Sequence, residues 1–285
     1  MSNDAPRVLG TAAHVARLLG GDSSVHSLYG PEGSPVYHFL TRYDEADAEA
    51  MLEIAEGKKG TLLELACGSG RLTFPFLENG FDAVGLDMSP HMLSLFAERL
   101  EEEKEDGTDY SDRVSTVQGD MTSFSLDRTF DFITLGANAV SYLGPDQRAS
   151  LFASVREHLA ADGRFLMTLI EFPGIEKRTE PFETQAIVAT GADADIPMLL
   201  TLLDFVDPVE SLRSSNFLAQ RVEDGAIVDA KIFTALSHVL PAAPLRAEIE
   251  AAGMRVLQQH EVISQFQIQA SFAITPKIYL LEAGL

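Results

Sequence analysis

The stretch "LLELACGSGRLTFPF", residues 62–76, decides the fold of this chain. In it an apolar run meets two close glycines, Gly68 and Gly70, and then becomes amphipathic. This order predicts a strand, a tight loop and the start of a helix. Such a loop can cradle a phosphate, hold a different cofactor or be only a tight turn, and the surrounding sequence has to decide between these uses.

The composition indicates a large globular chain with a strongly acidic surface. Its 285 residues, 46% of them hydrophobic, suffice for one large domain or for one domain with a sizeable insertion. The net charge of −22 repels phosphate backbones and attracts cations, so we expect no nucleic acid partner; the charge can equally serve solubility alone. The single cysteine, Cys67, fits a reducing compartment, and we expect a cytoplasmic protein with no signal peptide and no membrane partner.

Strands and helices alternate through the first two thirds of the chain. A helix is expected over 44–56, and later helices over about 70–79, from Ser89 onward and over about 145–160. Strands are expected over 61–66, 82–87, 113–120, 130–136 and 163–172. Alternation with short loops predicts an α/β fold in which a parallel sheet is covered on both faces.

The alternation of strands and helices is absent on either side of this region. Residues 1–43 are expected to form an irregular N-terminal lid segment, and residues 182–240 an inserted antiparallel sheet with a hairpin at Asp224-Gly225. Residues 44–181 and 241–285 are expected to form the core. In its last part we expect a helix over 245–253 and strands near 254–263 and 271–282.

An acidic residue at the end of the next strand indicates which kind of ligand the glycine loop binds. In open α/β sheets ligands bind at the carboxyl ends of the strands, and an acid that ends the next strand can hydrogen-bond ribose hydroxyls. Asp87 stands there, which implies an adenosine-type cofactor. The dinucleotide pattern has a third glycine where this chain has Thr73, which counts against NAD, although this third position varies between proteins.

Three motifs together carry a family resemblance. "ELACGSG", "GLDMS" and "QGDM" follow one another over residues 61–172, in an order and spacing that resemble the class I S-adenosylmethionine-dependent methyltransferases. The resemblance implies a Rossmann-like sheet, here with an inserted antiparallel β-sheet and an N-terminal lid, and S-adenosyl-L-methionine as cofactor, with S-adenosyl-L-homocysteine as product.

The resemblance also implies which residues bind the cofactor. Glu64 and the backbone of Ala66–Gly70, with Gly68 in the middle, would hold the methionine end, and Asp87 would bind both ribose hydroxyls. Met88 would pack on the adenine, and Asp120, Met121 and Gly136 would complete the pocket, Asp120 through the adenine amine.

The same residues can also be interpreted without a role in cofactor binding. Arg71 reaches the cofactor carboxylate or is a surface helix residue. Asp87 could only cap the following helix, Met88 and Met121 could be core residues, and Cys67 is expected to pack beneath the loop.

The region after the fourth strand is expected to face the acceptor. In "GANAVSYLG", residues 136–144, the candidates that would orient an acceptor are Asn138, Ser141 and Tyr142. Alternatively, Asn138 caps a short helix and Tyr142 is half-buried. His238 and Glu171 are candidate bases, with Tyr142 as a wall of the site. Because the histidines lack metal-ligand spacing, we expect no metal.

The layout of the extra segments suggests the substrate class. A segment ahead of the core and a sheet inserted after the fifth strand resemble the small-molecule N-methyltransferases, above all the sugar-amine N,N-dimethyltransferases of antibiotic pathways. "HSLYGPEGSPVYHFL", residues 26–40, also resembles methyltransferases that dimethylate the N-terminus of daptide-type peptides. We therefore expect a small-molecule or peptide amine as partner. The alternatives are O- or carboxyl-methylation, and a non-catalytic cofactor-binding protein.

Three tyrosines lie among the glycines and prolines of the N-terminal segment. We expect Tyr29 or Tyr37 to close over the methionine end of the cofactor, with Tyr43 nearby, because loops of this composition can order over a ligand. The alternative is an arm that packs on the sheet or on the second subunit of a homodimer.

Overall fold

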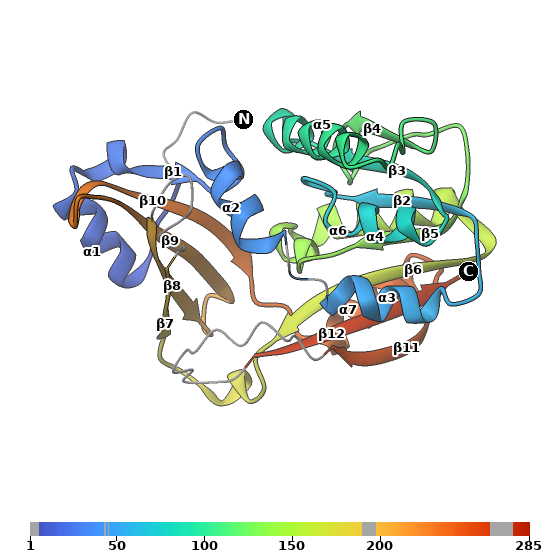
Figure 1. Ribbon diagram of the computed structural model, residues 1–285. Helices are drawn as coiled ribbons and strands as arrows, with labels where there is room; N and C mark the ends of the chain where they lie inside the picture. Colours follow the sequence, from blue (N-terminus) through green and yellow to red (C-terminus); the bar gives the residue numbers. More distant parts are fainter. Residues whose placement is uncertain (1–5, 43, 45, 190–197, 263–275) are drawn as a thin grey trace. The chain divides into compact units, whose positions relative to one another are not determined.

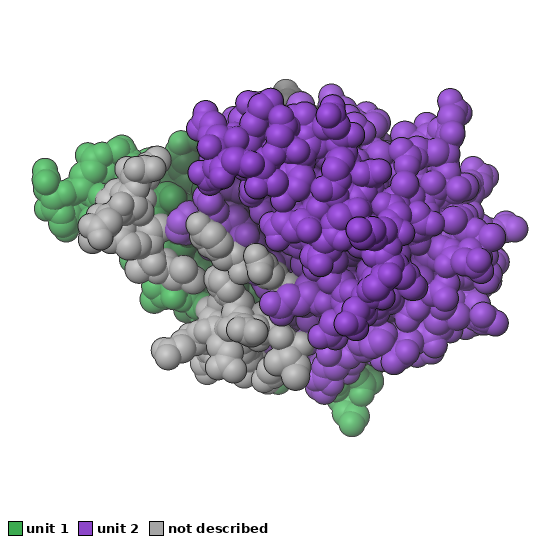
Figure 2. Space-filling view, turned by 45° about the vertical axis from the view of Figure 1, so that its right-hand side comes forward, with its two compact units in different colours: residues 1–37, 172–239, 266–275 green, residues 38–171, 240–265, 276–285 purple. Residues whose placement is uncertain are grey.

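The computed structural model describes residues 6–42, 44, 46–189, 198–262 and 276–285 (Figure 1). The chain divides into two compact units, which Figure 2 distinguishes by colour. We call residues 38–171, 240–265 and 276–285 the core unit, and residues 1–37, 172–239 and 266–275 the insertion unit.

The core unit contains a seven-stranded sheet with the order β11-β12-β6-β5-β2-β3-β4. Its first five strands along the chain pair in parallel, and the last two pair antiparallel at one edge. The parallel sheet expected from the sequence is therefore present. The strands are β2 (Thr61–Leu65), β3 (Asp82–Asp87), β4 (Val114–Gln118), β5 (Phe130–Leu135), β6 (Leu159–Glu171), β11 (Arg255–Val262) and β12 (Lys277–Gly284).

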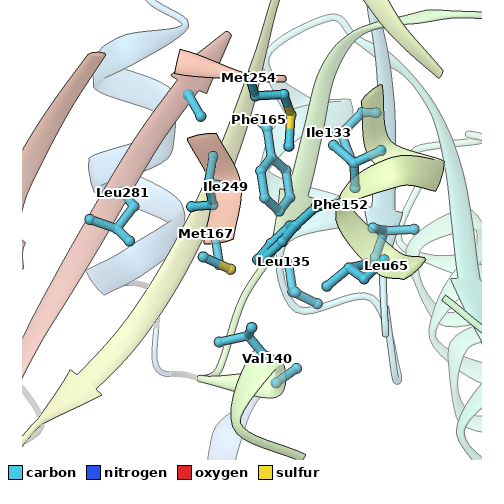
Figure 3. Close-up of a cluster of buried hydrophobic side chains, with 14 of the residues drawn as sticks. Leu65, Ile133, Leu135, Val140, Phe152, Phe165, Met167, Ile249, Met254 and Leu281 are labelled. Atoms are coloured by element: carbon cyan, nitrogen blue, oxygen red, sulfur yellow. The ribbon is translucent and has the colours of Figure 1, made fainter. Parts of the chain in front are cut away.

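Helices cover both faces of this sheet, because successive residues of each buried strand point to opposite faces. Leu63 and Leu65 of β2 belong to one apolar cluster with the helices α6 and α7 (Figure 3). Leu62 belongs to a second cluster with α3, α4 and α5. The helices are α3 (Ala46–Ile54), α4 (Thr73–Glu78), α5 (Pro90–Glu105), α6 (Pro145–His158) and α7 (Ala242–Ala251).

The start of α5 follows the sequence prediction. The backbone N–H of Met92 donates to the Ser89 hydroxyl at 3.4 Å, and Pro90 occupies the first helical position. Proline is favoured there because the first N–H groups of a helix have no partner within the helix.

The insertion unit contains a five-stranded sheet with the order β1-β10-β9-β8-β7. Its last four strands along the chain form an antiparallel meander, and β1 pairs in parallel with β10. The hairpin between β9 and β10 turns at Asp224 (φ 49°) and Gly225 (φ 76°), as predicted. The strands are β1 (Val25–Ser27), β7 (Phe182–Ala189), β8 (Met198–Asp207), β9 (Leu212–Glu223) and β10 (Ala226–His238).

Within residues 6–42 the N-terminal segment forms regular helices and a strand, and the prediction that it is irregular was wrong. It forms α1 (Gly10–Leu18), a 3-10 turn (Gly21–Ser24), β1 and α2 (Gly33–Thr41), with the boundary between the units inside α2. The glycines serve close packing here: a Cβ on Gly33 would lie 2.3 Å from the carbonyl oxygen of Ser27. Residues 1–37 thus belong to the same unit as the inserted strands.

Candidate cofactor and acceptor site

The glycine loop follows β2 at the carboxyl end of the core sheet. Three of its residues have positive φ: Ala66 (52°), Gly68 (54°) and Gly70 (83°). A Cβ on Gly70 would lie 2.6 Å from the rings of Phe74 and Phe96, whereas a Cβ on Gly68 would meet nothing closer than 3.9 Å. Packing therefore requires a glycine at position 70, while the space beside Gly68 is open to a ligand.

Asp87 joins the end of β3 to this loop. Its Oδ2 accepts a hydrogen bond from the Gly68 N–H and its Oδ1 accepts one from the Ser89 N–H, both at 2.8 Å. Burial raises the pKa of this carboxyl above its usual value, although backbone hydrogen bonds oppose the shift. A carboxylate has about four acceptor positions, so Asp87 can still accept from ribose hydroxyls. Capping α5 is therefore not its only contribution.

Cys67 packs beneath the loop, as expected. Its side chain is buried, and a Cβ on Gly85 would lie 2.8 Å from its sulfur. Burial, together with the charges of Glu64 and Asp87, raises the pKa of the thiol well above its usual range. Because the thiolate is the nucleophilic form, this cysteine is a packing residue.

Glu64 is a buried carboxyl group under the same loop. Its Oε2 accepts a hydrogen bond from the hydroxyl of Thr73, the residue that replaces the third glycine of the dinucleotide pattern. Burial raises the pKa of Glu64 to about 8, against the lowering effects of Thr73 and Arg71. Thr73 is thus explained by its partner, since a glycine there would leave Glu64 without this hydrogen bond.

Arg71 is held by an acidic residue that the sequence reading did not single out. Its guanidinium binds both carboxylate oxygens of Asp47 on α3, with Nη2 2.8 Å from Oδ2, and donates to the Asp44 carbonyl at 2.7 Å. The Arg71 side chain is 12% exposed, so the interpretation as a surface helix residue was wrong. Its contact with the cofactor carboxylate stays a prediction.

The same carboxylate links three segments around the loop. Oδ2 of Asp47 also accepts from the Ala137 N–H at 3.4 Å, just after β5. A Cβ on Gly136 would lie 2.6 Å from Leu72 and 3.3 Å from Arg71. Gly136 therefore permits the close approach of the β5 end to the glycine loop.

His38 is a second residue that the sequence reading missed at this loop. Its Nδ1 lies 2.7 Å from the hydroxyl of the buried Ser69, within hydrogen-bond distance. Burial, with the nearby cations Arg42 and Arg99, lowers the pKa of His38. A neutral imidazole thus links α2 to the loop at neutral pH.

The adenine side of the predicted pocket is more open. Met88 is 51% exposed, so its interpretation as a core residue was wrong, and Met121 is half-buried against the cluster of Figure 3. Asp120 is exposed, and its Oδ1 accepts from the Thr122 N–H at 2.8 Å and from the Thr122 hydroxyl at 2.7 Å.

These features fit an adenosyl cofactor. The open space beside Gly68 lies next to a carboxylate with acceptor capacity, Asp87, and Met88 presents an exposed apolar side chain. Among the described residues, no group of three metal-ligating side chains comes together.

Comparisons with known proteins support the same assignment. A family model described as a methyltransferase domain matches residues 62–163. A cypemycin N-terminal methyltransferase of a Streptomyces species is 30% identical over 106 residues, 36% of this chain and 39% of that protein. A dTDP-3-amino-3,4,6-trideoxy-alpha-D-glucopyranose N,N-dimethyltransferase of Streptomyces venezuelae is 27% identical over 131 residues, 46% of this chain and 51% of that protein. These matches thus span about half or less of each relative.

A solved structure matches over almost the whole chain. The glycopeptide N-methyltransferase MtfA, complexed with sinefungin, is 26% identical with a TM-score of 0.62, covering 98% of this chain and 99% of that chain. MtfA has also been crystallised with S-adenosyl-L-methionine and with S-adenosyl-L-homocysteine. The chain belongs to the class I S-adenosylmethionine-dependent methyltransferases. Its expected cofactor, S-adenosyl-L-methionine, and its Rossmann-like fold are confirmed.

In this methyltransferase the loop after β5 is fastened by its own polar groups. Asn138 has a positive φ of 59°, donates from Nδ2 to the Ser141 hydroxyl at 2.9 Å, and accepts from the Ile170 N–H at 2.9 Å. Its carbonyl accepts from the N–H and hydroxyl of Ser141 at the start of a 3-10 turn (Ala139–Tyr142). Ser141 is 1% exposed and Tyr142 is 36% exposed. The first two side chains thus have partners within the loop, and their contact with an acceptor stays a prediction.

The other candidates of the methyltransferase lie in different places. Glu171, in the core unit, accepts from the Ala242 N–H at 3.2 Å at the start of α7. His238 ends β10 in the insertion unit. Tyr29 and Tyr37, also in the insertion unit, pack edge to face with ring centroids 5.2 Å apart, and Tyr43 lies outside the described residues. The roles assigned to these residues stay predictions.

Among the residues that the structure describes, no helix is both long and apolar enough to cross a bilayer.

Proposed function

We propose that this methyltransferase transfers methyl groups to a primary amine of a natural product, such as an amino sugar or a peptide N-terminus, and does so twice. The observation that carries the proposal is the match to the glycopeptide N-methyltransferase MtfA, which covers 98% of the chain and thus includes the insertion unit. The names of the two curated relatives, an N-terminal methyltransferase and a sugar N,N-dimethyltransferase, support the same acceptor chemistry.

The chain's own residues would bind the cofactor, and the protein would then have to align the acceptor with the methyl group. Asp87 would bind the ribose, the open backbone around Gly68 would hold the methionine end, and Met88 would cover the adenine. When bound, S-adenosyl-L-methionine supplies a methyl group on a positively charged sulfur, which leaves as the thioether of S-adenosyl-L-homocysteine. Because this donor is already activated, the protein contributes mainly proximity and orientation.

An amine acceptor places two further requirements on the protein. It arrives protonated at neutral pH, so it has to lose a proton before its lone pair can react. After two methylations the nitrogen still has a lone pair, so a stop at the dimethyl product requires steric exclusion. The exposed ring of Tyr142 is the wall we propose for the core unit.

Mass spectrometry of the products tests the proposal. The panel consists of an unblocked short peptide, a nucleotide-linked amino sugar and benzylamine, each beside its carboxylic acid and alcohol counterparts. We expect mono- and then dimethylated amine to accumulate in order, without a trimethyl product. A base-labile methyl ester or an ether as the only product would replace the amine with an oxygen acceptor, and no product with any acceptor would favour a cofactor-binding protein without catalysis.

A further inference from the structure

Backbone hydrogen bonds hold the glycine loop at its two glycines. The Gly68 N–H donates to Oδ2 of Asp87, and the Gly70 N–H donates to the carbonyl of Cys67, both at 2.8 Å. Glycine loses more conformational freedom on ordering than any other residue, so a loop with two glycines is costly to hold in one shape. A further contact that holds the residue between them would favour ligand binding, because the loop would then be ordered in advance.

Ser69 is the residue between the glycines, and its side chain has such a contact. Ser69 is 6% exposed, and its hydroxyl lies 2.7 Å from Nδ1 of His38. A Cβ on Gly68, by contrast, would meet nothing closer than 3.9 Å. The hydroxyl thus faces a protein side chain, whereas the space for a ligand is beside Gly68. This arrangement lets His38 act on a ligand through the shape of the loop.

His38 is itself fixed near the end of α2. Its carbonyl accepts from the Arg42 N–H at 2.9 Å. Burial, with the cations Arg42 and Arg99, lowers the pKa of its imidazole, and the charges of Glu98 and Glu102 oppose this shift only in part. The ring is therefore uncharged at neutral pH, and in either tautomer it can form one hydrogen bond with a hydroxyl. This hydrogen bond lies within the core unit, which begins at residue 38.

We propose that His38 is a positioning residue for the cofactor. By holding the Ser69 hydroxyl, it keeps the glycine loop in the shape that binds S-adenosyl-L-methionine, so that less conformational freedom is lost on binding. Coupling between two sites is reciprocal, so cofactor binding in turn stabilises the end of α2 that carries His38. Because α2 contains the boundary between the two units, the cofactor stabilises the segment that connects them. The inference rests on the methyltransferase family alone, and not on the amine acceptor.

A double-mutant cycle on cofactor affinity tests the pair. Isothermal titration calorimetry gives the dissociation constant of S-adenosyl-L-homocysteine for the wild type, His38→Leu, Ser69→Ala and the double variant. We expect each single variant to weaken binding about 3- to 10-fold, the size of one uncharged hydrogen bond. Because both variants remove the same bond, the double variant should bind no more weakly than the weaker single variant.

A serine elsewhere in the core unit provides the control for the cycle. Ser150 is exposed on α6, and its hydroxyl donates to the carbonyl of Asp146 at 3.1 Å, so Ser150→Ala also removes a hydrogen bond. This variant should bind the cofactor product as the wild type does. Unchanged affinity of the two single variants, or a double variant that shows the product of their effects, would overturn the proposal.

Two conservative variants of His38 separate positioning from packing. An asparagine amide reaches the position of Nδ1 and can keep the hydrogen bond to Ser69, whereas a glutamine amide reaches the position of Nε2. We expect His38→Asn to bind S-adenosyl-L-homocysteine within about twofold of the wild type, and His38→Gln to bind as weakly as His38→Leu. Glutamine is the better helix former, so an effect on α2 stability alone would favour His38→Gln. Equal or tighter binding by His38→Gln would therefore overturn the proposal.

Hydrogen exchange tests the reciprocal effect on α2. Saturating S-adenosyl-L-homocysteine should slow the exchange of the amides of residues 38–41 in the wild type, and should slow it less in Ser69→Ala, whose α2 sequence is unchanged. The amides of α7 are measured in both proteins to correct for a change in global stability. Equal slowing in both proteins, or none in the wild type, would overturn the coupling.

These measurements use the cofactor product and no acceptor. Their outcome therefore does not depend on the proposed amine chemistry. Methylation of oxygen alone in the acceptor panel would overturn the proposed function and leave the role of His38 standing, whereas failure of the double-mutant cycle would overturn the role of His38 and leave the amine acceptor standing.

Discussion

At the scale of single residues, Asp87 connects the family motif to a measurable affinity. Asp87→Ala removes a charged acceptor for the ribose and the partner of the Gly68 N–H. We expect binding of S-adenosyl-L-methionine to weaken by about 1–3 kcal/mol, the range for a hydrogen bond to a charged group. Isothermal titration calorimetry measures this, with the exposed Asp112→Ala as the control. An unchanged affinity in Asp87→Ala would contradict the assignment of the ribose site.

Glu64 makes a prediction about pH, because burial raises its pKa to about 8 in the folded protein. Between the unfolded value near 4.5 and the folded value, the folded state binds the extra proton, so stability falls as pH rises through this window. We expect the free energy of unfolding of the cofactor-free wild type to fall, relative to Glu64→Gln, by roughly 1 kcal/mol per pH unit between pH 5 and 8. Urea denaturation at several pH values tests this. Parallel curves for both proteins would show that Glu64 is ionised in the fold.

At the scale of elements, the ion pair between Arg71 and Asp47 fastens α3 to the glycine loop. Both side chains are nearly buried, so Asp47→Asn leaves the guanidinium without its charged partner. We expect a loss of about 3 kcal/mol in the free energy of unfolding, as for other broken buried pairs. The exposed pair of Lys277 and Glu261 provides the control, since Glu261→Gln should cost less than about 1 kcal/mol. Equal effects of the two variants in urea denaturation would contradict a fastening role.

The elements also show what could be predicted from the sequence. The alternating strands and helices of the core and the Asp224-Gly225 hairpin follow from local patterns, and both are present. The helices α1 and α2 were missed because their glycines looked like loop residues, whereas Gly33 serves a close approach to Ser27. That approach depends on residues that folding brings together, so no local sequence pattern could predict it.

The residues of the candidate site also fall into two groups, those that could be predicted from the sequence and those that could not. Positions in the family motifs, such as Asp87, could be named from the sequence because their spacing carries the information. Asp47 could not, since an acid in the first turn of a helix is common for reasons of the helix dipole alone. His38 could not be named either, since only folding brings it within hydrogen-bond distance of the Ser69 hydroxyl.

At the scale of the whole molecule, the net charge of −22 makes a prediction about the acceptor. A strongly acidic surface raises the local concentration of an ammonium compound, and salt screens this attraction over a Debye length of about 10 Å at about 0.1 M. If the acceptor is an amine, its KM should rise several-fold, on the order of the steering effect, between about 0.02 and 0.3 M sodium chloride, with kcat nearly constant. Sucrose at matched osmolality is the control, because it does not screen charge. A KM that is independent of salt would mean that the acidic surface serves solubility only. The amine would then be selected by short-range contacts in its binding site.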